Sequence, residues 1–100
     1  MIRRMIPHPE SVAKMPLEIR IAFVAMKAAM RADDRNPSAG KEALITAHLA
    51  HNAAELLQRT TDPQEITIYK FACREHAADA RKIALRIAKA HKKGIEEARL

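Results

Sequence analysis

A basic stretch near the C-terminus is the strongest chemical feature of the sequence. Between residues 81 and 93 there are six Lys or Arg side chains, one His and no acid. Such a concentrated positive field attracts phosphate backbones through counterion release, which needs no reading of bases. It attracts acidic protein surfaces for the same electrostatic reason. The candidate residues for binding nucleic acid or an acidic partner are Arg81, Lys82, Arg86, Lys89, Lys92 and Lys93.

The same charges also have a purely structural interpretation. Lys and Arg near the C-terminal end of a helix complement its dipole and keep the protein in solution. The six side chains do not line one narrow face, and the acids Glu96 and Glu97 follow directly. The stretch contains no Phe, Tyr or Trp on which single-stranded bases could stack. Any nucleic-acid contact is therefore expected to be directed at the phosphate backbone and to be weakly selective.

A second pattern has the spacing of metal ligands. His48, His51 and Glu55 lie at positions i, i+3 and i+7, which places two imidazoles and a carboxylate on one face of a helix. Helical bundles assemble metal sites from such groups, but di-iron sites need more carboxylates than this chain offers. A solvated histidine face explains the same residues. We therefore expect no metal or cofactor, and these three residues are the candidates to examine.

Cys73 and His76 stand one helical turn apart, and a thiol beside an imidazole suggests a nucleophile. Both residues occupy positions where burial is expected, and a buried cysteine behaves as a small apolar residue. The sequence also lacks a glycine-rich phosphate loop, because Gly40 and Gly94 stand alone, and it lacks a nucleophile elbow. These observations argue against an enzyme.

The composition indicates a single all-α domain. The chain has 100 residues, of which 48% are hydrophobic and 3% aromatic, and it has two glycines and a formal net charge of +6. This length suits one domain, and so few glycines argue against the many turns of a β-sandwich or barrel. The single cysteine cannot form an internal disulfide, which favours a cytoplasmic location. No apolar run approaches the length of a membrane span, so we expect no membrane contact.

The helix signals predict a small bundle of about four helices, with a short first helix and three longer ones. Residues 1–8 are predicted to be an irregular basic arm, and residues 9–100 a single helical domain. Pro16 ends the short helix because it has no N–H to donate. The next helices are expected over about 16–33, from Asn36 or Pro37 to about 59, and from Asp62 onward. In the helix from Asp62 onward, we expect Asp62 to be the N-cap and Pro63 to occupy the first helical position. The side chain of Glu65 is expected to reach back to the N-cap residue.

The helix faces give the expected packing. The alanines of helix 16–33 permit a close approach to a neighbouring helix. Helix 37–59 is expected to bury Ile45, Leu49, Ala53, Leu56 and Leu57, with alanines at the flanks and His48 and His51 opposite. The last helix carries a seam at alternating spacings of three and four, as in a heptad repeat. The seam residues are Ile66, Tyr69, Cys73, His76, Ala80, Ile83, Ile87, Ala90 and Gly94.

The last helix is the longest, and it exceeds the diameter of a compact domain of this size. Its C-terminal end should therefore project beyond the bundle and meet solvent or another molecule, and we favour a homodimer. A second stripe on this helix, Phe71, Ala78 and Leu85, supports that preference. The same stripe could equally receive the short first helix.

The favoured function is a non-enzymatic, adaptor or inhibitor-type protein that occludes the surface of a protein partner. Met15, Met26 and Met30 would supply adaptable contacts if they are exposed. The alternative is a nucleic-acid-binding protein that grips phosphates with the basic stretch. A third interpretation is a helical-bundle metal-binding protein.

Overall fold

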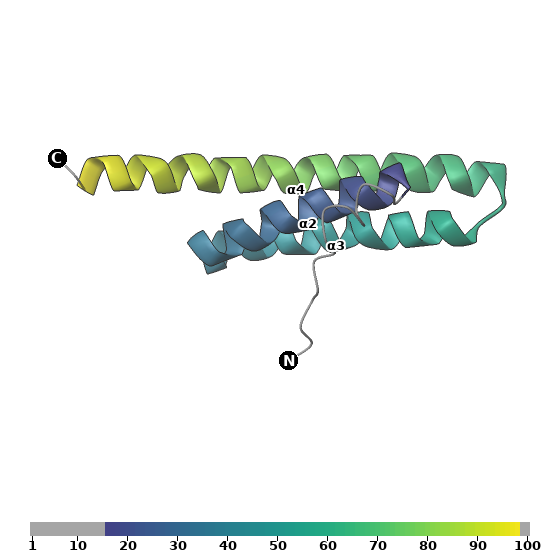
Figure 1. Cartoon of the computed structure of the whole chain (residues 1–100), viewed down its shortest axis with the longest axis horizontal. Coiled ribbons are helices and arrows are strands. Elements are labelled where there is room, and N and C mark those ends of the chain that lie inside the picture. The colour runs from purple at the N-terminus through teal and green to yellow at the C-terminus, as the bar shows by residue number, and fades with distance from the viewer. Residues whose placement is uncertain (1–15, 99–100) are drawn as a thin grey trace.

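The computed structural model describes residues 16–98, which form three helices. They are α2 (Leu17–Arg35), α3 (Pro37–Arg59) and α4 (Pro63–Ala98). The three run up, down and up, and every pair of them is in contact (Figure 1). The all-α class is confirmed, with three helices rather than about four in this part of the chain. The predicted arm over 1–8 and the predicted short helix over 9–15 lie outside the described residues.

Asn36 alone separates α2 from α3. Its backbone N–H donates to the carbonyl of Ala32 at 2.9 Å and closes α2. Its side-chain Oδ1 accepts from the N–H of Ala39 at 3.2 Å, and Pro37 fills the first position of α3. Asn36 is therefore the N-cap of α3, since its short polar side chain satisfies a first-turn donor, and Pro37 has no N–H to satisfy. This one-residue corner brings the start of α3 directly against the end of α2.

The start of α4 follows the prediction in part. Asp62 Oδ1 accepts from the N–H of Gln64 at 2.9 Å, as expected of a cap. Glu65, however, does not reach the backbone N–H of Asp62. Its Oε2 accepts from the Thr60 hydroxyl at 2.5 Å, and the hydroxyl oxygen accepts from the Asp62 N–H at 3.2 Å. The expected direct contact was wrong, because Thr60 lies between the two groups and bridges them.

Alanine fills the centre of the bundle. Because a methyl group is the whole side chain, helices that meet through alanine can approach closely, and the distance between helix axes depends on the side chains at the contact. Within residues 16–98, Cys73 is the one fully covered residue with a side chain larger than a methyl group. The principal buried alanines are Ala22, Ala25, Ala29, Ala43, Ala47, Ala50, Ala54, Ala77 and Ala80.

The core face predicted for α3 was wrong for three of its five residues, whereas Ala53 is buried as expected and Leu57 is partly buried. Ile45 is 63% exposed, and Leu49 and Leu56 are each 45% exposed, whereas the alanines expected at the flanks point into the core. The physical reason is that α2 and α4 present alanine to α3, and only a small side chain fits between helices this close. Ile45, Leu49 and Leu56 therefore point outward. His51, expected on the far face, lies beside the core and stacks edge-on against Phe23 of α2, with ring centroids 5.6 Å apart.

The projection of α4 beyond the bundle is confirmed. At about 1.5 Å per residue its 36 residues extend about 54 Å, whereas the 23 residues of α3 extend about 35 Å. Figure 1 shows the C-terminal end of α4 passing beyond the corner between α2 and α3. Of the seam positions, Cys73, Ala80 and Ile87 are buried, whereas Ala90 and Gly94 are exposed. We call the exposed end, residues 89–98, the overhang.

The two glycines occupy opposite environments. A Cβ on Gly40 would clash with the backbone of α2, because Asp33 N would lie 2.6 Å away and Ala32 C 2.9 Å away. Gly94, in the overhang, has nothing within 4 Å of the same added atom. Neither glycine has a positive φ, so the difference between them is one of space alone. Gly40 is therefore required by the close corner at Asn36.

Replacing each glycine by alanine should have effects of opposite sign. Gly40→Ala forces α2 and α3 apart and should lower the free energy of unfolding by about 1–3 kcal/mol, as overpacking does. Gly94→Ala should raise helix content, since alanine is favoured over glycine in a helix by about 1 kcal/mol. Urea unfolding followed by circular dichroism measures both quantities. An unaltered urea midpoint for Gly40→Ala would contradict the close corner.

Candidate interaction surfaces

A basic groove runs between α2 and α4. It has a volume of about 490 Å³ and a floor of small apolar side chains contributed by both helices. Four cations line it: Arg31 and Arg35 from α2, and Arg81 and Lys82 from α4. Within residues 16–98 none of the four takes part in an ion pair, so their charges are available to a ligand. The apolar lining consists of Ala28, Ala78, Ala84, Leu85 and Ala88.

Two stripes of residues at seven-residue intervals flank this groove. Leu17, Val24 and Arg31 share one side of α2, and Phe71, Ala78 and Leu85 share one side of α4. Phe71 is 67% exposed, Leu85 is 55% exposed and Val24 is 49% exposed. The second of these stripes was predicted from the sequence, but its pairing with the α2 stripe was not. The pairing depends on the register of two helices that lie far apart in the chain.

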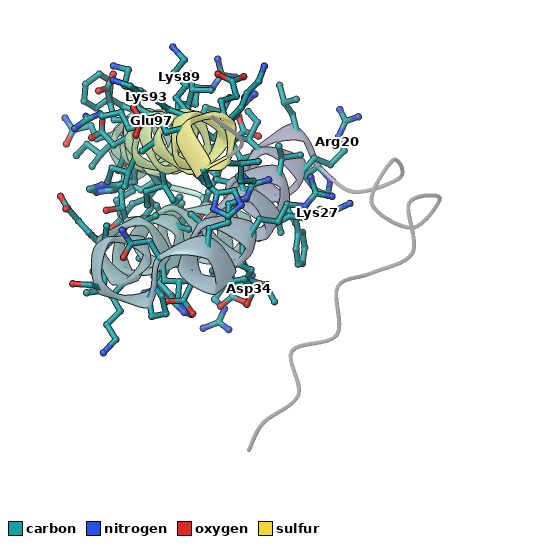
Figure 2. The ribbon with its side chains drawn as sticks, turned by 90° about the vertical axis from the view of Figure 1, so that its left-hand side faces the viewer. Arg20, Lys27, Asp34, Lys89, Lys93 and Glu97 are labelled. Atoms are coloured by element: carbon teal, nitrogen blue, oxygen red, sulfur yellow. The ribbon has the colours of Figure 1, made fainter. Side chains whose placement is uncertain are left out.

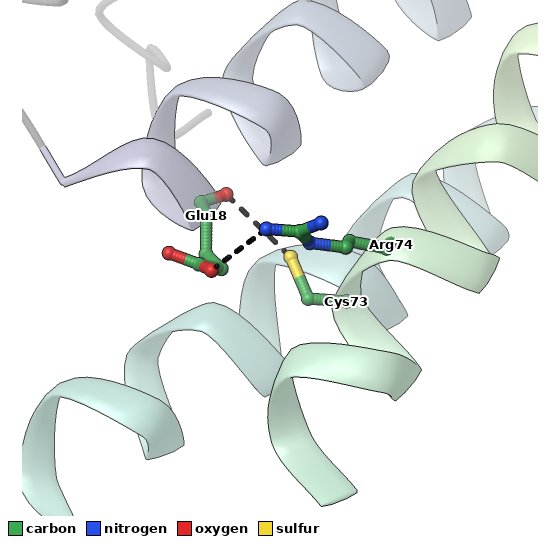
Figure 3. A network of polar contacts seen from close by, with 3 residues as sticks. All are labelled: Glu18, Cys73 and Arg74. Atoms are coloured by element: carbon green, nitrogen blue, oxygen red, sulfur yellow. Dashed lines mark hydrogen bonds and ion pairs between the residues drawn. The ribbon is translucent and has the colours of Figure 1, made fainter. Parts of the chain in front are cut away.

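Contacts of Glu18 set that register (Figure 3). The thiol of Cys73 donates to the backbone carbonyl of Glu18 at 3.5 Å, and Arg74 Nη2 lies 3.5 Å from Glu18 Oε1. The Glu18 side chain is nearly covered, and it lies in the first turn of α2, where the helix dipole favours a negative charge. Because residue 18 meets residue 73, Leu17 stands at the level of Phe71 and Arg31 at the level of Leu85.

The structure distributes the six predicted binding residues over three places. Arg81 and Lys82 line the basic groove. Arg86 borders a second hollow of about 400 Å³, which it shares with Arg35 and His91. The others belong to the overhang and are exposed: Lys89, Lys92 and Lys93.

Arg35 contributes to both hollows, so the positive surface continues from the basic groove toward the overhang. Figure 2 looks along the long axis and shows Lys89 and Lys93 on the side of α4 turned away from α2 and α3. The positive charge therefore wraps around the end of α4. Sequence reasoning missed Arg31 and Arg35, because only the packing of α2 on α4 brings them to the basic stretch.

The predicted metal ligands are not gathered into a site. Within the described part of the chain no group of three His, Cys, Asp or Glu side chains could hold a metal ion. His51 Nδ1 lies 3.8 Å from Glu55 Oε1, and its ring also stacks on Phe23. These contacts with protein groups account for the orientation of His51.

Cys73 is a structural thiol. It is fully buried, and burial raises the pKa of its thiol, with the negative charge of Glu18 acting in the same direction and Arg74 opposing both. A raised pKa keeps the sulfur protonated at neutral pH, whereas nucleophilic attack needs an exposed thiolate. The arrangement in Figure 3 therefore supports packing and hydrogen bonding at this position.

Comparison of this chain with protein families, with curated proteins and with solved structures found no match. Separately, none of the three helices between residues 16 and 98 combines the length and apolar content needed to cross a membrane.

The raised pKa of Cys73 predicts a loss of stability at alkaline pH. Below about pH 8.5, the ordinary pKa of a thiol, the group is protonated in both the folded and the unfolded chain and its contribution is fully present. As the pH rises further, the unfolded chain ionises first, so the free energy of unfolding falls until the pH passes the folded pKa.

Urea midpoints measured at pH 7 and pH 10 test this expectation. The wild type should lose more stability over this interval than Cys73→Ala does, whatever the two proteins' stabilities at pH 7. Equal losses in the two proteins would show that the thiol does not titrate differently on unfolding.

Proposed function

We propose that this chain is a non-enzymatic protein–protein interaction module, of adaptor or inhibitor type, which occludes the surface of an acidic partner. Its binding site is the basic groove with its two flanking stripes. Support comes chiefly from one observation: large apolar side chains lie outward while alanine fills the core. A cytoplasmic location fits this proposal, since the one cysteine is buried and unpaired.

The exposed apolar side chains support a protein partner in particular. Contiguous exposed apolar surface rimmed by polar residues is typical of interaction sites. Leu85 lines the groove, and Leu17, Val24 and Phe71 are exposed large residues on the two stripes that lead into it. Contacts with the partner are assigned to these residues and not to the methionines, because Met26 is buried and Met30 packs against the core. Met15 lies outside the described residues.

The charges of the groove specify the chemistry of the partner. Its four cations line the groove together with Leu85, whereas Phe71 and Leu17 lie outside the groove, toward the start of the two stripes. An amphipathic helix with one apolar face and carboxylates toward one end matches both features, since helices bind in grooves through anchors spaced by three and four residues. Charge complementarity then favours an acidic partner over other helices and orients it.

Removing the apolar anchors should abolish partner binding. Full-length protein and the variant Phe71→Ser/Leu85→Ser are used to capture partners from nuclease-treated extract of the native host. The wild type should retain an acidic protein in a fixed ratio, and the purified partner should bind at least tenfold more weakly to the variant, because losing each anchor costs about 1–2 kcal/mol. Isothermal titration calorimetry measures that difference.

Ile68→Ser/Ile95→Ser is the matched control. Ile68 and Ile95 are also exposed apolar residues on α4, but they belong neither to the groove lining nor to the stripe of Phe71, Ala78 and Leu85. The control should bind the partner as the wild type does. Equal loss of binding in both variants, or recovery of nucleic acid alone, would contradict the proposed site.

A nucleic-acid ligand is the second candidate, and it is favoured by the continuity of the positive surface from the groove to the overhang. Eight cations follow this path without an ion pair within the described residues: Arg31, Arg35, Arg81, Lys82, Arg86, Lys89, Lys92 and Lys93. Such a surface would contact phosphates and would follow the salt dependence of counterion release.

Charge removal tests this candidate. The variant Arg86→Gln/Lys89→Gln/Lys93→Gln should weaken binding to a short DNA duplex, and its salt slope should fall by about 0.9 for each phosphate that the protein no longer neutralises. Lys27→Gln/Lys41→Gln/Lys70→Gln removes the same charge from other exposed positions and should keep most of the affinity. Fluorescence anisotropy over a salt series measures both. Equal slopes of affinity against salt for the two variants would exclude Arg86 and the overhang lysines as a nucleic-acid site.

A further inference from the structure

The outward side of α3 carries an apolar ridge separate from the basic groove. We define the α3 ridge as Ile45, Leu49, Asn52 and Leu56, which follow one another at spacings of four, three and four. These are the spacings of a coiled-coil seam, and the three large side chains are among the exposed apolar residues of the protein. Ala47 and Ala54, on the opposite side of α3, are buried in the core. The ridge therefore has no partner within the described chain.

The ridge is complementary to itself when it is reversed. In an antiparallel dimer, a twofold axis passes between residues 50 and 51 of the two α3 helices. It places a residue of one copy opposite the residue of the other copy whose number, added to its own, gives 101. Ile45 then faces Leu56 of a second copy, and Leu49 faces Asn52. One turn beyond, Glu42 faces Arg59, so a negative charge meets a positive one at each end. Both side chains are exposed, and neither forms an ion pair within residues 16–98.

The end charges also decide the direction of pairing. In a parallel dimer each residue would face its own counterpart, so Glu42 would meet Glu42 and Arg59 would meet Arg59. Like charges placed opposite one another are destabilising, whereas the antiparallel arrangement makes two attractive pairs.

The overhang offers a weaker surface for a second copy. Its seam positions are Ala90 and Gly94, and its exposed large apolar residue is Ile95. Lys89, Lys92 and Lys93 surround them, and two overhangs placed side by side would bring these charges together. The length of α4 suggests a dimer through its projecting end, but the overhang exposes one large apolar side chain, whereas the α3 ridge exposes three.

We propose that two copies of this chain form an antiparallel dimer through the α3 ridge, with Ile45 against Leu56 and Glu42 against Arg59 across the twofold axis. The basic groove faces away from this interface, since it lies between α2 and α4. The dimer would therefore present two grooves, which strengthens binding to a partner that carries two sites. The dimer does not depend on the identity of the partner.

Charge reversal tests the interface and its direction together. Sedimentation equilibrium and light scattering should show a dimer for the full-length wild type. Glu42→Arg alone replaces two attractive pairs with two repulsive ones and should raise the dimer dissociation constant on the order of tenfold. Arg59→Glu alone should do the same. The double variant Glu42→Arg/Arg59→Glu restores opposite charges and should return the constant to the wild-type range.

Two further variants show whether apolar contact drives the dimer. Leu49→Asp should give a monomer with unchanged helix content, because the side chain is exposed and its loss leaves the core intact. Leu85→Asp makes the same change in the basic groove and should remain a dimer. A monomeric wild type would overturn the proposal, as would single charge reversals without effect, which a parallel dimer predicts. A dimer that is abolished in Leu85→Asp and kept in Leu49→Asp would place the interface elsewhere and overturn it also.

Discussion

Close contact between alanine faces is the constraint on which the rest of this structure depends. Three helices meet through methyl groups, and so their backbones can approach closely along much of α2 and α3. Each alanine buries little apolar area, but it also loses no side-chain entropy on burial. Where the three helices meet most closely the core is alanine, and Met26 and Ile87 are the larger apolar side chains buried within residues 16–98. Many other large apolar side chains are on the surface, where they become available for binding.

Several local features serve the same constraint. The single-residue corner at Asn36 holds the ends of α2 and α3 together, and Gly40 is needed because a side chain there would meet the α2 backbone. At the other end of the bundle, Glu18 contacts both Cys73 and Arg74 and fixes how far α4 is shifted along α2. That shift creates the basic groove, since it brings Arg31 and Arg35 beside the positive residues of α4.

The helix boundaries could be predicted because they depend on neighbours in sequence. Asn36 before Pro37 and Asp62 before Pro63 are short polar residues placed where first-turn donors need an acceptor. The core face of α3 could not be predicted in this way. Ranking by hydrophobicity favoured Ile45 and Leu49, whereas burial was decided by what α2 and α4 present at the contact. The alanine strip of α2 was recognised, but its consequence for the other helices was not.

The residues of the candidate site could likewise be predicted only where they lie on one helix. The positive charges of residues 81–93 and the stripe at Phe71, Ala78 and Leu85 could be read from one helix. Arg31 and Arg35 join them only through tertiary packing, which the local pattern does not encode. The apparent ligand set of His48, His51 and Glu55 depended on spacing alone. In the structure His51 is oriented by Phe23 and Glu55.

The central claim is that alanine lies inside and the large apolar residues lie outside. Two variants made in a Cys73→Ala background test it directly, each with a cysteine at one position: Leu85→Cys and Ala80→Cys. Their reaction with a water-soluble thiol reagent is measured in the folded protein and again in urea. The thiol at position 85 should react in the folded protein nearly as fast as in urea, and the thiol at position 80 should react only on unfolding. The opposite order would contradict the alanine core and the binding surfaces that depend on it.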